Sequence, residues 1–125
     1  SDVYKRQPLF ENIDAEKRQS IANILQPRLV IPAEVICKEG DAGDSMFFIS
    51  SGALSVNLKD GAVTLGSGEF FGEIALLIET PRVATVAANS FCELLVLRKA
   101  DFEELLVKSS QLKEEIEKVA AARLS

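Results

Sequence analysis

The sequence predicts an α+β protein, in which an antiparallel barrel or sandwich lies between helices at the two ends of the chain. Two observations predict this class. From about residue 28 to about residue 97, short apolar and β-branched runs alternate with glycine-containing turns, at intervals that suit antiparallel strands. Before and after this stretch, apolar residues recur every three or four positions, which is helical periodicity. Because helix and strand signals are segregated along the chain, the layout is α+β rather than α/β.

The N-terminal part is predicted to be helical. In IDAEKRQSIANIL, apolar residues recur at helical spacing between residues 13 and 25, and Asp14 is placed to cap the helix. The preceding PLFENI begins with a proline, which favours a short helical turn. Residues 1–7, SDVYKRQ, carry no capping or periodic pattern, so we interpret them as a disordered, ragged terminus or an expression or sequence-assembly scar. Residues 8–125 are then one domain.

Strands are predicted to follow. Pro27 and Pro32 break the helical periodicity, and the signal changes to short runs of strand-forming residues. Six glycines between residues 40 and 68 mark tight connections, since glycine accepts positive φ without penalty. The predicted strands are RLVI, EVICKE, SMFFIS, ALSVNL, AVTLG, VATVAA and CELLVL.

Two helices are predicted after Arg98. KADFEELLVKS places Phe102 and the two leucines that follow it on one face, and QLKEEIEKVAAARLS repeats apolar residues at three and four positions up to Arg123. The last helix therefore presents a narrow apolar stripe. Such a stripe is usually core packing, and the alternative is a face that docks in only one state of the protein.

The composition excludes several classes of function. The chain carries 14 Lys and Arg against 19 Asp and Glu, a net charge of −5, with no run of more than two basic residues. Because binding to nucleic-acid phosphates draws on concentrated positive charge, we expect no nucleic-acid partner. No apolar run approaches the roughly 20 residues of a membrane helix, so we expect no direct membrane insertion of this chain.

The chain contains no histidine. Its absence removes imidazole acid–base catalysis, Ser-His-Asp and Cys-His nucleophiles, and most zinc and iron sites. Cys37 and Cys92 lie in apolar strand-like runs without metal-ligand spacing, so we expect buried free thiols, with a disulfide as the alternative. EGDAGDSM lacks the closing Glu of a calcium loop. We therefore predict no catalytic residues, no metal site and no enzyme.

Residues 70–86 contain Glu73 and Arg82 among mostly apolar and small residues, in the stretch FFGEIALLIETPRVATV. FGEIALL predicts a helical turn opened by Gly72, whose first N–H groups lack helical partners. Arg82 would begin the strand RVATVAA, where its guanidinium and those N–H groups would bind an oxyanion. Glu73 would then accept a hydrogen bond from a hydroxyl of the same ligand. The alternative is a structural ion pair between Glu73 and Arg82. Burying an arginine without a partner costs several kcal/mol, so both interpretations stay open on composition alone.

This stretch closely resembles the phosphate-binding cassette of cyclic nucleotide-binding domains. Domains of that family occur in cAMP-dependent kinase regulatory subunits, catabolite-activator-type transcription factors and cyclic nucleotide-gated channels. The resemblance covers nearly the whole chain and includes PLFENI, EGDAGDSMFFISSGALSV, LGSGEFFGEIALL and LRKADFEEL. It implies an eight-stranded, jelly-roll-like β-roll, flanked by N-terminal helices and two C-terminal helices, that holds a cyclic nucleotide as ligand and needs no cofactor.

The resemblance also implies roles for individual positions. The backbone N–H groups of Ile74 and Ala75 would meet the cyclic phosphate, and Arg82 would neutralise it. The backbone of Val83 would close over the phosphate, while Glu73 would bind the ribose 2′-hydroxyl. The ligand-binding set predicted in this way is Phe71, Gly72, Glu73, Ile74, Ala75, Arg82, Val83, Ala84 and Arg123.

Two positions bear on the base of the nucleotide. In the family, Thr or Ser directly after the cassette arginine favours cGMP, and this chain has Val83 there, so we predict that cAMP binds more tightly than cGMP. Arg123 of the last helix is the candidate lid residue, with its planar guanidinium stacked on the base and Leu124 as the fallback. The alternative is that Arg123 is a solvated surface residue.

The sequence most resembles the cytoplasmic domain of bacterial cyclic nucleotide-gated potassium channels. This resemblance implies a cAMP sensor at the cytoplasmic face of the plasma membrane, whose closing lid helix gates the membrane channel region of the same full-length chain. The alternative is a cAMP-sensing module of a transcription regulator or of a kinase regulatory subunit. A cupin-type enzyme would share the glycine-punctuated strands but would need histidine ligands. A family member that no longer binds nucleotide is a further alternative, although Glu73 and Arg82 are both present.

Overall fold

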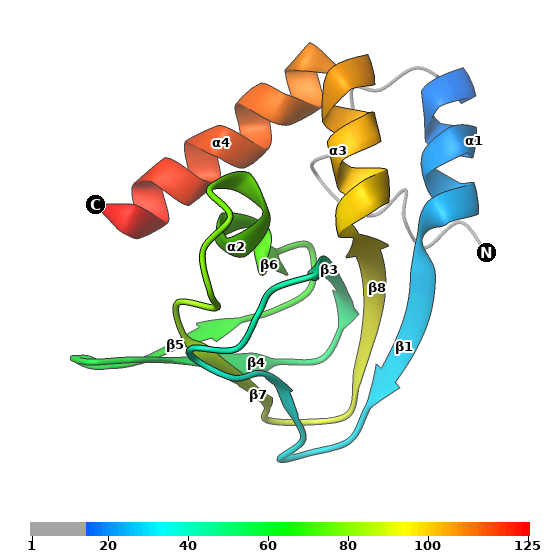
Figure 1. Ribbon diagram of the computed structural model, residues 1–125. Coiled ribbons are helices and arrows are strands. Elements are labelled where there is room, and N and C mark those ends of the chain that lie inside the picture. The colour runs from blue at the N-terminus through cyan, green and yellow to red at the C-terminus, as the bar shows by residue number, and fades with distance from the viewer. Residues whose placement is uncertain (1–14) are drawn as a thin grey trace.

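The computed structural model describes residues 15–125, and Figure 1 shows how the elements are arranged. Helices α1, α3 and α4 lie on one side of the strands, and the short α2 lies between α4 and the sheets (Figure 1). The elements in chain order are α1 Ala15–Ile24, β1 Gln26–Val30, β2 Val35–Cys37, β3 Ser45–Ser51, β4 Leu54–Leu58, β5 Gly61–Leu65, β6 Phe70–Phe71, α2 Glu73–Leu77, β7 Thr85–Ala88, β8 Cys92–Arg98, α3 Lys99–Lys108 and α4 Ser110–Leu124.

The strands form two four-stranded antiparallel sheets, in the orders β1-β8-β3-β6 and β2-β7-β4-β5. The predicted α+β class and antiparallel roll are therefore confirmed. Pro27 lies in β1, at the edge of its sheet, where a strand tolerates a missing backbone donor. No helix within residues 15–125 is long and apolar enough to cross a membrane.

Strand β3 contributes to two hydrophobic cores. Successive side chains of a strand point to opposite faces, and six consecutive residues of β3 are buried. Phe47 and Ile49 pack between the two sheets, whereas Met46 and Phe48 pack under the helices. Burying a side chain as large as Phe48 contributes roughly 1.5–3 kcal/mol, so β3 joins the roll firmly to its helical cap.

Some local predictions are corrected by the structure. Strand β6 was not predicted, because two residues are too few to show an alternating pattern. Arg82 was expected at the start of a strand, but β7 begins at Thr85 and Arg82 lies in the preceding loop. Cys37 and Cys92 are buried free thiols, as expected. The predicted Asp14 cap, the PLFENI turn and the interpretation of residues 1–7 lie outside the described residues.

Candidate functional site

The site is built around the sharp turn from β6 into α2. Both residues of β6 pair with β3, Phe71 opposite Phe47 and Phe70 opposite Phe48, so the approach to the turn is fixed. Gly72 then adopts a φ of 88°, which strongly favours glycine. A Cβ there would lie 2.8 Å from Arg82 Nη1 and would also crowd the backbone of β3. The turn therefore brings the start of α2 against the Arg82 side chain.

Arg82 is fixed at both its backbone and its side chain. Its N–H donates to Asp41 O at 2.7 Å, and its carbonyl accepts from Gly40 N at 2.9 Å. The side chain is buried, and Nη1 donates to Gly72 O at 3.2 Å. Within the described residues this is the only hydrogen bond of the guanidinium, which has five N–H donors. A buried cation is thus left with most of its donors available.

Glu73 is the most deeply buried charged residue of the site, with 1% of its surface exposed. Its Oε1 accepts a hydrogen bond from Arg123 Nη1 at 2.5 Å, while Oε2 has no partner among the described residues. Burial raises the pKa of the Glu73 carboxyl above its usual range, and the Arg123 guanidinium partly offsets this shift. A buried acceptor without a donor costs free energy, and a ligand hydroxyl would supply the donor.

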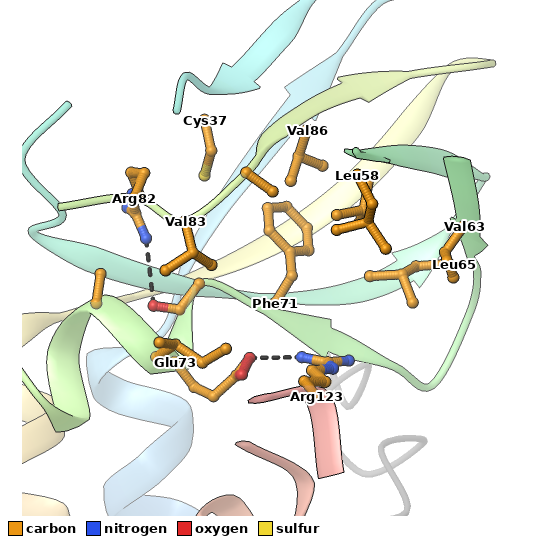
Figure 2. A pocket seen from close by; sticks show the side chains of 15 residues that line it. Cys37, Leu58, Val63, Leu65, Phe71, Glu73, Arg82, Val83, Val86 and Arg123 are labelled. Atoms are coloured by element: carbon orange, nitrogen blue, oxygen red, sulfur yellow. Dashed lines mark hydrogen bonds and ion pairs between the residues drawn. The ribbon is translucent and has the colours of Figure 1, made fainter. Parts of the chain in front are cut away.

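Arg123 reaches the site from the last turn of α4. Besides its bond to Glu73, its Nη2 donates to Phe70 O at 2.6 Å, and its guanidinium lies 5.2 Å from the centroid of the Phe70 ring. Figure 2 shows the contact between Glu73 and Arg123, and separately the bond from Arg82 to the backbone. The ion pair that was considered between Glu73 and Arg82 is therefore not formed. Arg123 is exposed as a whole residue, but its side chain, 28% exposed, is held by these contacts, and its stacking on a base stays a prediction.

A cavity of about 280 Å³ lies between these residues, close to the lower end of the ~300–1,000 Å³ of small-molecule sites. All nine residues of the predicted ligand-binding set line it. The apolar wall of the cavity, which Figure 2 shows around Phe71, was not predicted from the sequence. Alternation along β4 and β5 was the signal that could have revealed this wall, because it turns every second side chain inward. The additional lining residues are Cys37, Val56, Leu58, Val63, Leu65 and Val86.

Replacing Glu73 with glutamine is expected to change the pH dependence of stability. The native pKa of the Glu73 carboxyl is raised above its ordinary value of 4.5. The carboxyl therefore contributes most to the free energy of unfolding below pH 4.5, where it is protonated in both the folded and the unfolded state. The contribution is then lost as the pH rises through the raised value. Urea unfolding of both proteins from about pH 4 to about pH 8 should show the variant gaining stability relative to the parent as pH rises. A constant difference, or the opposite trend, would contradict this assignment.

The described residues contain no group of three or more His, Cys, Asp or Glu side chains that could hold a metal ion. The polar lining of the cavity is instead the Arg82 guanidinium with its free N–H groups, the Arg123 guanidinium that is bonded to Glu73 and Phe70 O, and the Glu73 carboxylate; most of the other lining residues are apolar. These groups suit an organic ligand that carries a negative charge, a hydroxyl and an apolar portion.

Comparisons with known proteins bear on this arrangement. A family model described as cyclic nucleotide-binding domain matches residues 15–109. A cyclic nucleotide-gated potassium channel of Rhizobium etli is 42% identical over 116 residues, which make up 93% of this chain and 33% of the channel. A cAMP-dependent protein kinase regulatory subunit of Colletotrichum orbiculare is 34% identical over 108 residues, or 84% of this chain and 28% of that protein.

The solved structures agree with the sequence relatives. A structure of PKAR CBD2 bound to Sp-2Cl-cAMPS matches with a TM-score of 0.82 and 29% identity, over 98% of this chain and 87% of that one. The present chain spans about a third or less of the length of the two curated relatives described above.

Proposed function

This chain belongs to the cyclic nucleotide-binding domain family, and from that premise we propose that its cavity binds cAMP more tightly than cGMP and that its last helix transmits binding to an attached potassium channel. The resemblance to the family, and to bacterial cyclic nucleotide-gated potassium channels within it, is confirmed by the comparisons. The ligand preference, the coupling and the attached channel are the proposal.

One observation carries the proposal for the ligand. Arg82 and Glu73 line the same cavity, and Oε2 of Glu73 has no partner among the described residues, so a cation with free donors and a carboxylate with a free acceptor would meet one ligand. A cyclic phosphate carries one negative charge that suits Arg82, and the neighbouring ribose hydroxyl would donate to Glu73. A free carboxylate or a second phosphate charge near Glu73 would be repelled by its carboxylate.

The apolar wall accounts for the base. Val56, Leu58, Val63 and Leu65 are contributed by the paired strands β4 and β5, and they lie in the same cavity as the two charged groups. A purine ring can pack on these side chains while the phosphate and ribose of the same nucleotide bind Arg82 and Glu73. The N–H groups at the start of α2 would add donors to the phosphate, as the family resemblance implies for Ile74 and Ala75.

Replacing Val83 with threonine should narrow the preference for cAMP. Val83 lines the cavity directly after Arg82 and is about half exposed, so an added hydroxyl is accommodated there. One hydrogen bond to guanine is worth about 1 kcal/mol, so cGMP affinity should rise by about fivefold while cAMP affinity changes by less than about twofold. Calorimetric titration of both proteins with cAMP and cGMP measures this. An unchanged ratio would remove Val83 as a determinant of base preference.

The same titration of the parent chain tests the proposed ligand. Saturable binding of cAMP with one site per chain, tighter than cGMP and absent for uncyclised AMP, is the expected result. AMP is the informative control, because it keeps the base and ribose but carries up to two phosphate charges and no ring closure. Failure to bind any cyclic nucleotide would overturn the proposal, and tighter binding of cGMP would overturn its choice of base.

The proposed coupling uses the contact between α4 and the cavity. Arg123 connects the end of α4 to Glu73, so a ligand that bonds Glu73 also biases the position of the helix. The proposed context is the cytoplasmic face of the plasma membrane, with the channel region in the same full-length chain. No enzymatic activity is proposed. The second candidate is a kinase regulatory module, favoured by the 34% identity to the Colletotrichum subunit, and the flanking sequence of the full-length protein distinguishes the two.

A further inference from the structure

Behind Arg82, on the side of the two-sheet core, lies the aromatic ring of Phe47. The Arg82 guanidinium carbon is 5.6 Å from the centroid of that ring, within the range of a cation–π contact. Phe47 does not line the nucleotide cavity and is almost fully buried. We propose that Phe47 is a positioning residue: its ring supports the guanidinium and so orients the free N–H donors toward the phosphate. This inference rests on the proposed function of the cavity.

The ring of Phe47 is itself fixed in place. It stacks on Phe71, with the ring centroids 4.9 Å apart and an interplanar angle of 18°. The two residues face each other in the pairing of β3 with β6, and Phe71 does line the cavity. Stacked aromatic pairs of this kind are stabilising beyond their buried area. One rigid aromatic pair therefore supports the arginine on one side and forms part of the cavity wall on the other.

The Arg82 guanidinium has other neighbours besides the Phe47 ring. Its hydrogen bond to Gly72 O fixes one nitrogen, and Gly43 lies so close that an added Cβ would be 3.2 Å from Arg82 Nε. A single hydrogen bond lets the planar group pivot, so packing against its neighbours is needed to set its orientation. The Phe47 ring, packed against the guanidinium carbon, would restrict that pivoting, and the orientation of the group decides whether two N–H groups can reach the phosphate together.

The first test is Phe47→Leu, which keeps an apolar side chain and removes the ring. Loss of one partly desolvated cation–π contact should weaken cAMP binding by about 3- to 10-fold in calorimetric titration. Phe48→Leu is the matched control, because the next residue along β3 faces the helical core and its ring lies against Phe70 rather than Arg82. Both variants should lower the melting temperature, and only Phe47→Leu should lower the affinity by more than about twofold.

A change of ligand separates a positioning role from general loosening of the core. An uncharged alkyl phosphotriester of cAMP carries no negative charge for Arg82 to bind. Phe47→Leu should therefore weaken binding of the triester by less than about twofold, compared with the larger loss for cAMP. In an Arg82→Ala background, Phe47→Leu should likewise have no further effect on cAMP affinity. Equal losses for cAMP and the triester, or equal losses in Phe48→Leu, would overturn the proposal. If the parent chain fails to bind cAMP, the proposed function itself fails instead.

Discussion

Replacing Arg82 with alanine is expected to weaken cAMP binding by about 30- to 5,000-fold, which corresponds to the roughly 2–5 kcal/mol lost when one partner of a buried charge pair is truncated. Arg82 is buried, holds several free N–H donors and lines the cavity beside Glu73. Its removal leaves the phosphate charge without a partner while the negative charge of Glu73 remains. Calorimetric titration, or competition with a fluorescent cyclic nucleotide, measures the loss.

Arg28→Ala is the matched control for this prediction. It removes the same charge from the chain, but Arg28 is partly exposed and pairs with Glu34 at 3.0 Å. An effect of net charge alone would appear equally in both variants, whereas Arg28→Ala should change cAMP affinity by less than about twofold. Near-native far-ultraviolet circular dichroism of Arg82→Ala is needed to show that it is folded. A folded Arg82→Ala variant that binds cAMP within about fivefold of the parent would contradict the assignment of Arg82 as the residue that binds the phosphate.

Much of the site could be predicted because its residues are close together in the sequence. Gly72, Glu73 and Arg82 lie within eleven residues, and a glycine before a short apolar run predicts the turn that brings them together. Alternation along residues 82–86 also held: Arg82, Ala84 and Val86 are buried while Val83 is exposed. The burial alternates although residues 83 and 84 form a bend ahead of β7 rather than part of the strand.

The partner of Glu73 could not be found in this way. Arg123 is fifty residues further along the chain, and its approach depends on how α4 packs against α2. The family resemblance indicated that Arg123 belongs to the lid, and it suggested a base rather than a carboxylate as the contact. Nothing in local periodicity distinguishes those two targets. Tertiary packing places Arg123 at the buried Glu73 carboxylate, which is stabilised by a nearby cation.

The two oxygens of the Glu73 carboxylate would give the proposed coupling a route from ligand to helix. Oε1 accepts a hydrogen bond from Arg123, whereas Oε2 has no partner within residues 15–125, so a ligand hydroxyl could donate to it. A ribose hydroxyl that donates to Oε2 would favour the ionised carboxylate, and the ionised carboxylate in turn attracts Arg123. Binding and helix position would then be linked reciprocally, without contact between the base and α4.

Glu73→Gln should therefore weaken cAMP binding by about 10- to 100-fold, since hydrogen bonds to charged groups are worth about 1.5–3 kcal/mol. Arg123→Ala should cost about 3- to 10-fold, because its side chain is 28% exposed and solvent partly replaces its contacts. The double variant should lose less than the product of the two losses, since both remove the same ion pair. Strict multiplication of the two losses would show that the residues act independently.

The position of α4 is the decisive measurement for coupling. In the parent chain, cAMP should slow amide hydrogen exchange in the last two turns of α4, and both Glu73→Gln and Arg123→Ala should abolish that slowing. Lys108→Ala is the matched control, because it removes a helical cation whose pair with Glu104 is exposed and local. Its exchange response to cAMP should match that of the parent. Slowing that survives in Arg123→Ala would mean that the nucleotide acts on the helix by another contact, and the proposed route through Glu73 would be wrong.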